Sequence, residues 1–218
     1  MREVLRAAVL DAVSLVLPVE CAGCGSRDRS LCVRCHALLE PVLVSHELAG
    51  IPGVSTLRYD GEVRNILLAY KEEPRTGLAR AFAPALEAAL RAAPEDAEVL
   101  AVPTSRASFR RRGFDPVSTL LRAARYRSAD ALRVRSSVAQ KTLGVADRAA
   151  NRAGTMTARR QLAGHRFVLV DDVLTTGATI EEAARAVRAA GGEVIFFATL
   201  AFTPRLFGIR SDTAREIS

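Results

Sequence analysis

Residues 166–179 constrain the fold of this chain more than any other stretch, because an apolar run, two acids, a polar loop and a helical pattern follow one another there. Residues 167–170 are continuously apolar, the pattern of a strand that is buried on both faces of a parallel sheet. Asp171 and Asp172 follow directly. We therefore expect both acids at the carboxyl end of a buried strand.

A helix and a second strand are predicted after the loop. The inward positions of residues 180–190 are apolar and the outward ones are charged. The inward residues are Ile180, Ala183, Ala184 and Val187, and the outward ones are Glu181, Glu182, Arg185 and Arg188. Gly191 and Gly192 end the helix, and residues 194–202 form another apolar run. This strand, helix and strand, joined by a right-handed crossover, predict an α/β domain with an open, mainly parallel sheet flanked by helices.

The loop after the first strand is suited to bind phosphate. Parallel sheets bind ligands beyond the carboxyl ends of their strands, where helix N-termini offer free backbone N–H groups to an anion. Gly177 allows close approach of the backbone, and the hydroxyls of Thr175, Thr176 and Thr179 can donate to phosphate oxygens. Ionised carboxylates only accept hydrogen bonds, so the two acids suit a vicinal diol or a hydrated Mg²⁺. A ligand with a 5′-phosphate and ribose hydroxyls satisfies both halves.

Competing motifs fail on spacing. The chain has no G-x-x-x-x-G-K-[ST] phosphate loop and no G-x-G-x-x-G after a strand. Its two acids are adjacent, whereas an aspartyl-phosphate phosphatase needs one residue between them. An ordinary strand-turn-helix with capping acids is the structural alternative, and the combination of acids, hydroxyls and glycine argues against it.

Charge and composition are compatible with several classes of ligand and do not distinguish among them. The 218 residues are 49% hydrophobic, enough for an α/β core with a small appended unit, so we divide the chain into residues 1–50 and 51–218. The net charge of +7 suits an anionic ligand, nucleic acid or an acidic partner. Of 31 basic residues only Lys71 and Lys141 are lysines, so a cation in this chain is almost always an arginine.

The N-terminal residues predict a docking helix rather than an export signal. Residues 4–16 repeat apolar side chains at helical spacing, and Asp11 and Glu20 interrupt the apolar run that a signal peptide needs. No other segment reaches the roughly 18 consecutive apolar residues of a membrane span. We therefore expect a cytoplasmic protein with no membrane contact.

Four cysteines form two C-x-x-C pairs, Cys21 with Cys24 and Cys32 with Cys35, which can present thiolates to a tetrahedral metal. They predict a structural Zn²⁺ site, since disulfides, the alternative, are disfavoured in a reducing cytosol. Residues 32–36 also fit the C-x-x-C-H pattern of haem c attachment, which needs export and leaves the first pair unexplained. The zinc unit could touch a partner, but we favour a role as a staple for a segment too short to hold a core.

The rest of the chain alternates predicted helices and strands. Strands are expected over residues 54–59, 98–102 and 132–135, and helices over residues 62–71, 76–92 and from residue 117. The apolar residues Leu38, Leu39, Val42 and Leu43 should return the zinc unit to the main domain, and His46 is expected in a polar turn. Lys71, at the end of its helix, either faces the ligand crevice or complements the helix C-terminus.

Two polar segments complete the candidate site. Residues 104–113 hold four arginines, Arg106, Arg110, Arg111 and Arg112. They form either a solvated turn or, at the same sheet edge as the phosphate loop, a pyrophosphate clamp. Residues 136–157, with Lys141 and Arg148, lack apolar periodicity and are either disordered or, as we favour, a lid.

These motifs carry a family resemblance. Residues 170–179, Val-Asp-Asp-Val-Leu-Thr-Thr-Gly-Ala-Thr, resemble the phosphoribosyl-pyrophosphate (PRPP) motif of type I phosphoribosyltransferases. Nearly the whole chain is similar to the ComF/GntX family of competence-associated, phosphoribosyltransferase-like proteins. The further motifs that carry this similarity are the paired C-x-x-C motifs, the Tyr59 to Arg64 segment, Lys71, Val102-Pro103, Arg112-Gly113-Phe114 and the spacing of Gln140, Arg148 and Asn151. The resemblance implies a type I phosphoribosyltransferase fold behind a zinc-binding N-terminus, and a link to natural transformation or DNA uptake.

The resemblance implies an enzyme that transfers ribose 5-phosphate from Mg²⁺-PRPP to a nucleophile and releases pyrophosphate. The expected catalytic residues are Asp171, Asp172, Lys141 and Arg148. The expected PRPP-binding residues are Val173, Leu174, Thr175, Thr176, Gly177, Ala178, Thr179, Arg106, Arg112 and Arg135. Asp115-Pro116 departs from the family's usual Asn-Gln and places an acid beside the expected pyrophosphate site.

Two other functions stay open. A non-catalytic adaptor of DNA uptake or recombination could keep the PRPP fold as a scaffold or nucleotide sensor, and the zinc unit and the basic charge permit it. Direct DNA binding through the arginines is a further alternative, which the shortage of lysines and of interleaved aromatic side chains disfavours.

Overall fold

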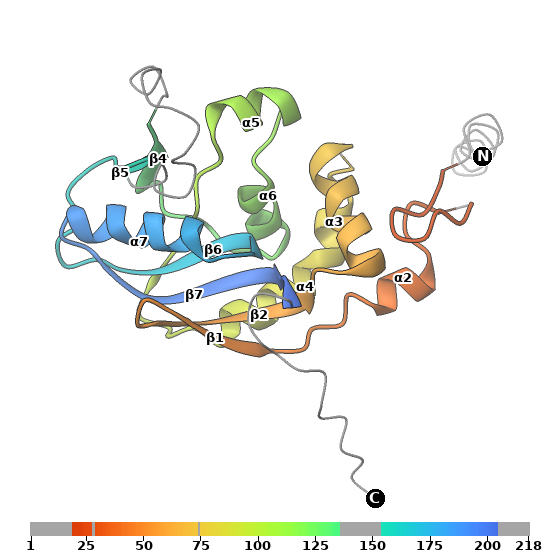
Figure 1. The fold of residues 1–218 in the computed structure, drawn as a ribbon, viewed down its shortest axis with the longest axis horizontal. Coiled ribbons are helices and arrows are strands. Elements are labelled where there is room, and N and C mark those ends of the chain that lie inside the picture. The colour runs from red at the N-terminus through yellow and green to blue at the C-terminus, as the bar shows by residue number, and fades with distance from the viewer. Residues whose placement is uncertain (1–18, 28, 74, 136–153, 205–218) are drawn as a thin grey trace, which may run out of the picture.

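A computed structural model describes residues 19–27, 29–73, 75–135 and 154–204 (Figure 1). Its centre is a five-stranded sheet in the order β1 (Val44–Leu48), β2 (Ile51–Arg58), β7 (Glu193–Phe202), β6 (Arg166–Leu174) and β3 (Glu98–Ala101). β1 runs antiparallel to β2, and the other neighbours are parallel. The open, mainly parallel sheet that the sequence predicts is therefore confirmed.

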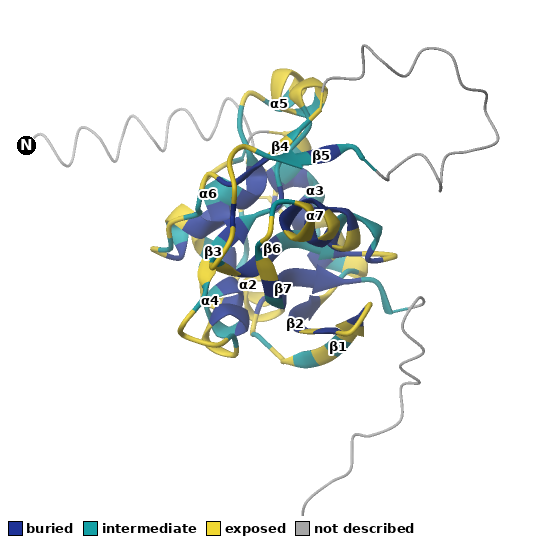
Figure 2. Ribbon diagram, turned by 90° about the vertical axis from the view of Figure 1, so that its left-hand side faces the viewer, coloured by how far each residue is buried: buried dark blue, intermediate teal, exposed yellow. Residues whose placement is uncertain are grey.

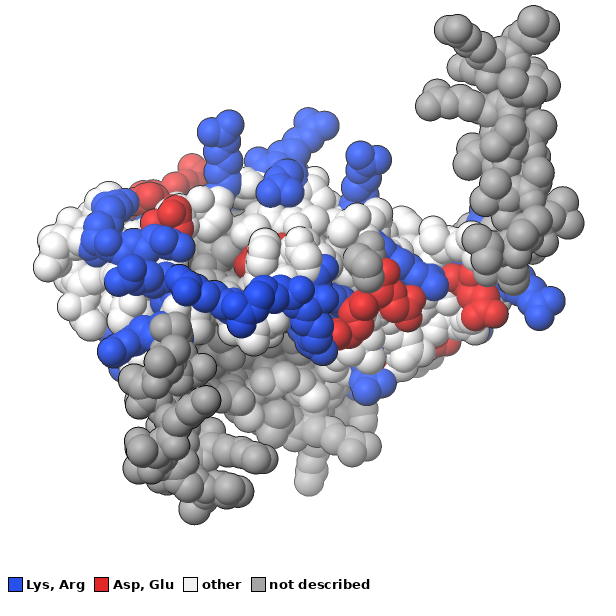
Figure 3. Space-filling view, turned by 90° about the horizontal axis from the view of Figure 1, so that it is seen from above, with Lys and Arg blue, Asp and Glu red and all other residues white. Residues whose placement is uncertain are grey.

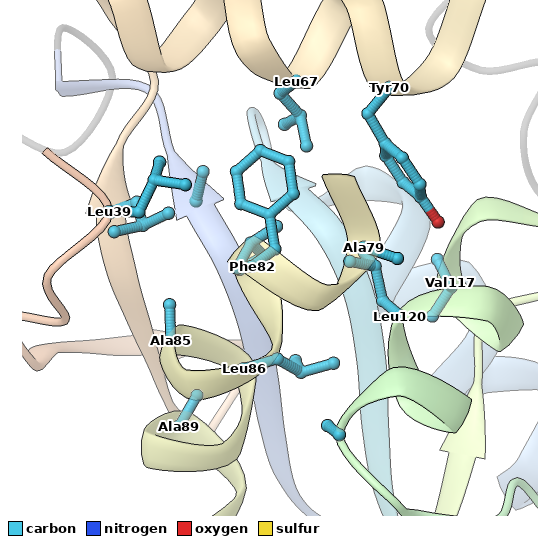
Figure 4. Packing of buried hydrophobic residues seen from close by; sticks show 14 of the residues in the cluster. Leu39, Leu67, Tyr70, Ala79, Phe82, Ala85, Leu86, Ala89, Val117 and Leu120 are labelled. Atoms are coloured by element: carbon cyan, nitrogen blue, oxygen red, sulfur yellow. The ribbon is translucent and has the colours of Figure 1, made fainter. Parts of the chain in front are cut away.

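Helices cover both faces of this sheet. α3 (Gly61–Glu72), α4 (Leu78–Arg91) and α6 (Pro116–Ala123) share one apolar cluster with the sheet, and α7 (Ala178–Ala189) belongs to a second cluster with Phe167, Leu169 and Phe197. Figure 4 shows the ring of Phe82, which is fully buried, close to Leu67 of α3 and to Leu39. The helices expected over residues 62–71, 76–92 and 180–190 are confirmed, and so is the strand expected over residues 194–202.

β6 continues four residues beyond its predicted end. Its ladder with β7 pairs Asp171 with Thr199, Val173 with Ala201 and Leu174 with Phe202. The prediction ended this strand at residue 170, before its first charged residue. Backbone pairing does not depend on side-chain charge, so the strand continues through the two acids to Leu174, which is buried. Both acids thus lie within the last residues of the strand, and the loop begins at Thr175.

The hairpin of β1 and β2 was not predicted, although the strand expected over residues 54–59 is confirmed as the second part of β2. Ala49 and Gly50 join the two strands, and both have positive φ angles, 48° and 75°, which suit a two-residue hairpin turn. His46, expected in a polar turn, instead lies in β1, with its ring centroid 5.3 Å from that of Phe202 and 6.5 Å from that of Phe197. Exposure alternates along β1, with Val44, His46 and Leu48 less exposed than Ser45 and Glu47, but the polar His46 at an inward position interrupts the apolar pattern in the sequence.

The segment that holds the four cysteines packs on α3. Asn65 donates a side-chain hydrogen bond to the carbonyl of Gly23 at 3.0 Å, and a Cβ added at Gly23 would meet Ile66 at 3.2 Å. Of the apolar residues expected to return this unit to the main domain, only Leu39 is buried. Leu38, Val42 and Leu43 are 44%, 68% and 53% exposed, but the segment does return to the main domain, because the backbone N–H of Val42 donates to the carbonyl of Thr56 in β2 at 3.0 Å.

A short helix and a two-stranded sheet lie above the main sheet in Figure 1. The arginine segment that was expected as a loop forms a short helix, α5 (Arg106–Arg112), none of whose residues is buried (Figure 2). β4 (Leu132–Val134) and β5 (Met156–Ala158) pair antiparallel, which confirms the strand expected over residues 132–135. The docking helix expected over residues 4–16 and residues 136–153 of the expected lid, with Lys141 and Arg148, lie outside the described residues. Among the described helices, none is long and apolar enough to cross a membrane.

Candidate functional site

Two adjacent carboxylates and one ammonium group form the centre of the site. Asp171 accepts a hydrogen bond from the backbone N–H of Asp172 at 2.9 Å. The Asp172 carboxylate lies 2.8 Å from the ammonium of Lys71, which belongs to the last turn of α3, and both side chains are about 15% exposed. Of the two interpretations of Lys71, the structure supports the one in which it faces the site.

The acid pair has an unusual charge state. Burial, followed by the charge of Asp172, raises the pKa of Asp171 to about 8, although Lys71 acts in the opposite direction. Asp171 therefore retains a proton at neutral pH in the absence of ligand. A protonated and an ionised carboxyl side by side can donate as well as accept hydrogen bonds, which suits ligand hydroxyls.

The loop after β6 reaches the N-terminus of α7 through a glycine that no other residue could replace without strain. Gly177 has a φ angle of 82°, and a Cβ at this position would lie 2.8 Å from the side chain of Leu48. Thr175 and Thr176 on its N-terminal side are exposed, while Ala178 and Thr179 begin the helix half-buried. The first N–H groups of a helix have no intrahelical acceptor, so the loop presents donors to an anion.

The arginine helix α5 contacts α3 through Glu72, the residue next to Lys71. The Glu72 carboxylate lies 3.0 Å from Arg111 and 3.2 Å from Arg112, and Glu72 follows Lys71 on α3. Arg112 therefore contacts the residue that follows Lys71 on α3, and its role at the site stays a prediction. No contact between described residues joins Arg106 or Arg135 to the acids. Arg135 continues β4 and donates its backbone N–H to Thr155 at 2.8 Å.

Asp115, the departure from the family pattern, has a structural role. It accepts a hydrogen bond from the backbone N–H of Ser118 at 2.8 Å and so caps α6, with Pro116 in the first turn. Tyr70 donates to the carbonyl of Pro116 at 2.7 Å and packs edge-to-face on Phe114. The charge of Asp115 also contributes to the raised pKa of Asp171, so this acid lies within electrostatic range of the pair.

One position of α7 was predicted on the wrong face of the helix. Glu182, expected to point outward, is 5% exposed and accepts a hydrogen bond from the backbone N–H of Met156 at 2.8 Å. Arg185 donates to Glu182 and to the carbonyl of Met156. Burial alone would raise the pKa of Glu182, but the hydrogen bonds from Arg185 and Met156 hold it below its usual value. The pair fixes β5, the strand that follows the undescribed residues 136–153.

The four cysteines lie together as the sequence predicts. Their sulfurs are within 4.8 Å of one another, Cys21 and Cys35 are buried, and the backbone N–H groups of Cys32 and Cys35 point at the sulfurs of Cys21 and Cys32. A hydrogen bond from the hydroxyl of Ser26 and another from its backbone lower the pKa of Cys24 to about 5, whereas burial raises that of Cys35. The set fits the Cys₄ coordination of structural zinc, which would displace the remaining thiol protons.

The face of the molecule that carries α5 is rich in cations. Figure 3, which views Figure 1 from above, shows Lys and Arg side chains across the width of this face. Such a surface attracts anionic ligands.

Comparison with known proteins gives one family match. Residues 99–209 match the family model described as phosphoribosyl transferase domain. This segment includes the acid pair, the phosphate loop and α7. No curated protein matches the sequence.

Several solved structures resemble the chain. Adenine phosphoribosyltransferase from Rhodothermus marinus is 21% identical, with a TM-score of 0.41 and coverage of 84% of this chain and 94% of that chain. The Saccharomyces cerevisiae adenine phosphoribosyltransferase is 20% identical, with a TM-score of 0.38 and coverage of 81% and 93%. A hypoxanthine phosphoribosyltransferase from Staphylococcus aureus is 12% identical, with a TM-score of 0.35 and coverage of 64% and 71%.

Proposed function

The chain belongs to the phosphoribosyl transferase domain family, and from this premise we propose that it is a phosphoribosyltransferase of the ComF type. In this proposal it binds PRPP together with Mg²⁺ and transfers the ribose 5-phosphate group to a nucleophile. The bond between the anomeric carbon and the pyrophosphate oxygen breaks, a bond from that carbon to the nucleophile forms, and pyrophosphate leaves.

The arrangement of the acid pair and the phosphate loop is the observation that carries this proposal. Asp171 and Asp172 lie at the end of β6, and the glycine-containing loop that follows leads directly into the N-terminus of α7. Donors for a phosphate and acceptors for a diol are thus separated by only a few residues of chain. This is the order of groups that a 5-phosphorylated ribose presents.

Each group has a distinct task in this reaction. The backbone N–H groups of residues 177–179 and the nearby hydroxyls hold the 5-phosphate, and the acids hold the ribose hydroxyls. Arg112, Arg106 and Arg135, with Lys141 and Arg148 from the undescribed segment, are proposed to bind the pyrophosphate. Mg²⁺ would supply further positive charge to the leaving group. Fixed charges of this kind stabilise a transition state with a developing oxocarbenium ion and a departing anion.

Pyrophosphate release tests this function. Purified protein would be incubated with Mg²⁺-PRPP and each of the common nucleobases in turn, and pyrophosphate would be measured. We expect release that depends on one class of acceptor and is lost in the variant Asp171→Asn with Asp172→Asn. Glu95→Gln, which removes an exposed acid remote from the pair in sequence, should retain it. PRPP binding without release for any acceptor would argue against turnover.

A structural zinc ion at Cys21, Cys24, Cys32 and Cys35 is part of the same proposal. The close grouping of the four sulfurs supports it. Elemental analysis of protein purified without added metal should find one zinc per chain. A disulfide between two of these cysteines in protein kept under reducing conditions would contradict the assignment.

A second candidate, an adaptor of DNA uptake, is favoured by the surface of the zinc unit. Val33 is 74% exposed on α2 (Val33–Ala37), and Val42 is 68% exposed after it. Exposed apolar side chains of this kind suit a protein partner. Hydrogen exchange discriminates the two functions, because catalysis needs residues 136–157 as a water-excluding lid. Slower exchange there at saturating Mg²⁺-PRPP favours the enzyme, and unchanged exchange favours the adaptor.

A further inference from the structure

Lys71 reaches the acid pair from outside the segment that matches the family. The family model begins at residue 99, whereas Lys71 lies on α3. Its ammonium is 2.8 Å from the Asp172 carboxylate, and the two side chains are 16% and 15% exposed. Among the ion pairs between described residues, no other has both side chains less than one fifth exposed. An interaction so shielded from water is stronger than a surface ion pair.

The position of Lys71 is fixed by the packing of its helix. Ile66, Leu67 and Tyr70 of α3 are fully buried, and Tyr70 is hydrogen-bonded to the carbonyl of Pro116. On the other side of Lys71, Glu72 pairs with the arginines of α5. The ammonium therefore cannot leave Asp172 by a movement of the helix without breaking these contacts.

Without this cation, the site would be poorly suited to an anion. Asp171 and Asp172 are adjacent, and the charge of Asp115 acts on the same place. A ligand that brings a phosphate towards the charges of Asp172 and Asp115 meets repulsion that is only weakly screened in a partly buried site. One fixed positive charge beside Asp172 offsets much of this repulsion.

We propose that Lys71 is a built-in cation of the phosphoribosyl site, which neutralises Asp172 so that a phosphorylated ribose binds at the acid pair without a divalent metal. The inference rests on the proposed function. In this proposal the protein itself neutralises the acid beside the ribose, and Mg²⁺ is needed only to neutralise a pyrophosphate group. Binding of ribose 5-phosphate should then be independent of Mg²⁺, while binding of PRPP should depend on it.

Calorimetric titration with ribose 5-phosphate, in the presence of either EDTA or Mg²⁺, tests this inference. For the wild type we expect the same Kd, within about twofold, in both buffers, since that ligand carries no pyrophosphate. In Lys71→Gln, we expect a Kd at least about tenfold higher in EDTA, the size of effect that follows from removing one of two close charged partners. Mg²⁺ should restore most of that loss, because it can then occupy the place next to Asp172.

Two variants control for other effects of the substitution. Lys71→Arg retains the charge and should behave as the wild type. Arg64→Gln removes one positive charge from an exposed position on the same helix and should change neither Kd. Thermal melting of each variant establishes that it is folded, and the wild-type comparison between the two buffers tests the inference even if Lys71→Gln does not fold.

The outcomes distinguish this inference from the function on which it rests. Equal affinity of Lys71→Gln and wild type in EDTA would overturn the inference, and so would a loss of the same size in both buffers, which marks Lys71 as merely structural. A wild type that binds Mg²⁺-PRPP but needs Mg²⁺ for ribose 5-phosphate would overturn the inference alone. A wild type that binds neither ligand would overturn the proposed function as well.

Discussion

Gly177 illustrates how a single residue determines the shape of the phosphate loop. Its φ angle of 82° places it in the left-handed region, and the space beside its Cα is filled by Leu48 of β1. The residue therefore meets two independent requirements, one of backbone conformation and one of packing. Only the first is visible in the sequence, since Leu48 belongs to a strand that the sequence analysis missed.

Substitution of this glycine should show both requirements. Gly177→Ala should lower the free energy of unfolding by about 2–4 kcal/mol, the sum of left-handed strain and the displacement of Leu48. Gly164 has a similar φ angle of 78° but no atom within 4 Å of an added Cβ, so Gly164→Ala should lose only about 1–2 kcal/mol. Urea denaturation measures both values, and equal losses would contradict the packing contribution of Leu48.

The raised pKa of Asp171 predicts how stability depends on pH. The folded protein holds a proton on Asp171 up to about pH 8, whereas the unfolded chain releases it near the ordinary value of 3.8. The folded state therefore binds more protons between these values, and the contribution of Asp171 to stability falls as the pH rises through this window. The variant Asp171→Asn has no group that titrates at this position. Its unfolding free energy should therefore rise relative to that of the wild type as the pH increases from about 5 to about 8. A constant difference between the two proteins would show that Asp171 titrates normally.

At the scale of secondary-structure elements, the contacts of α7 show what a helical pattern can and cannot predict. The spacing of Ile180, Ala183 and Val187 predicts its length and its buried face, because apolar burial follows the helical repeat. It does not predict that Glu182 is buried, since that carboxylate is satisfied by the backbone of β5, far away in the sequence. α5 was missed for the opposite reason, as an exposed arginine helix has no apolar face to reveal it.

Removal of the Glu182 carboxylate should release β5. Glu182→Ala leaves the N–H of Met156 and the guanidinium of Arg185 without their acceptor, which should cost about 1–3 kcal/mol of unfolding free energy. Glu181→Ala, at the exposed neighbouring position of the same helix, is the matched control and should change stability by less than about 0.5 kcal/mol. Denaturant unfolding of the two variants decides the matter, and indistinguishable stabilities would mean that the contact with β5 contributes nothing.

The helix α3 joins the segment of the four cysteines to the acid pair. It bonds to Gly23 through Asn65 and to Asp172 through Lys71, six residues apart on the same rigid element. Removal of the proposed zinc ion with a chelator should therefore speed amide hydrogen exchange along residues 61–72, because the first half of α3 loses its support. Exchange in α7, which packs on the opposite face of the sheet, should stay as it was. Equal acceleration in both helices would indicate global unfolding instead.

On the scale of the whole molecule, the segment that matches the family is not a self-sufficient unit. β2 lies outside residues 99–209, yet it pairs in parallel with β7 in the interior of the sheet, and α3 and α4 cover one face of that sheet. The sequence motifs around the acid pair predict the centre of the site because they are contiguous. Lys71 and Glu72 come from a distant part of the chain, and only the fold brings them to that centre.

The central claim is that the acid pair and the loop after it form a site for PRPP. Calorimetric titration of the wild type with Mg²⁺-PRPP tests it most directly, beside the variant Asp171→Asn with Asp172→Asn. We expect one binding site per chain in the wild type, and no detectable binding in the variant under conditions where thermal melting shows that it is folded. Unchanged binding by a folded variant would contradict it, and so would an absence of binding by the wild type.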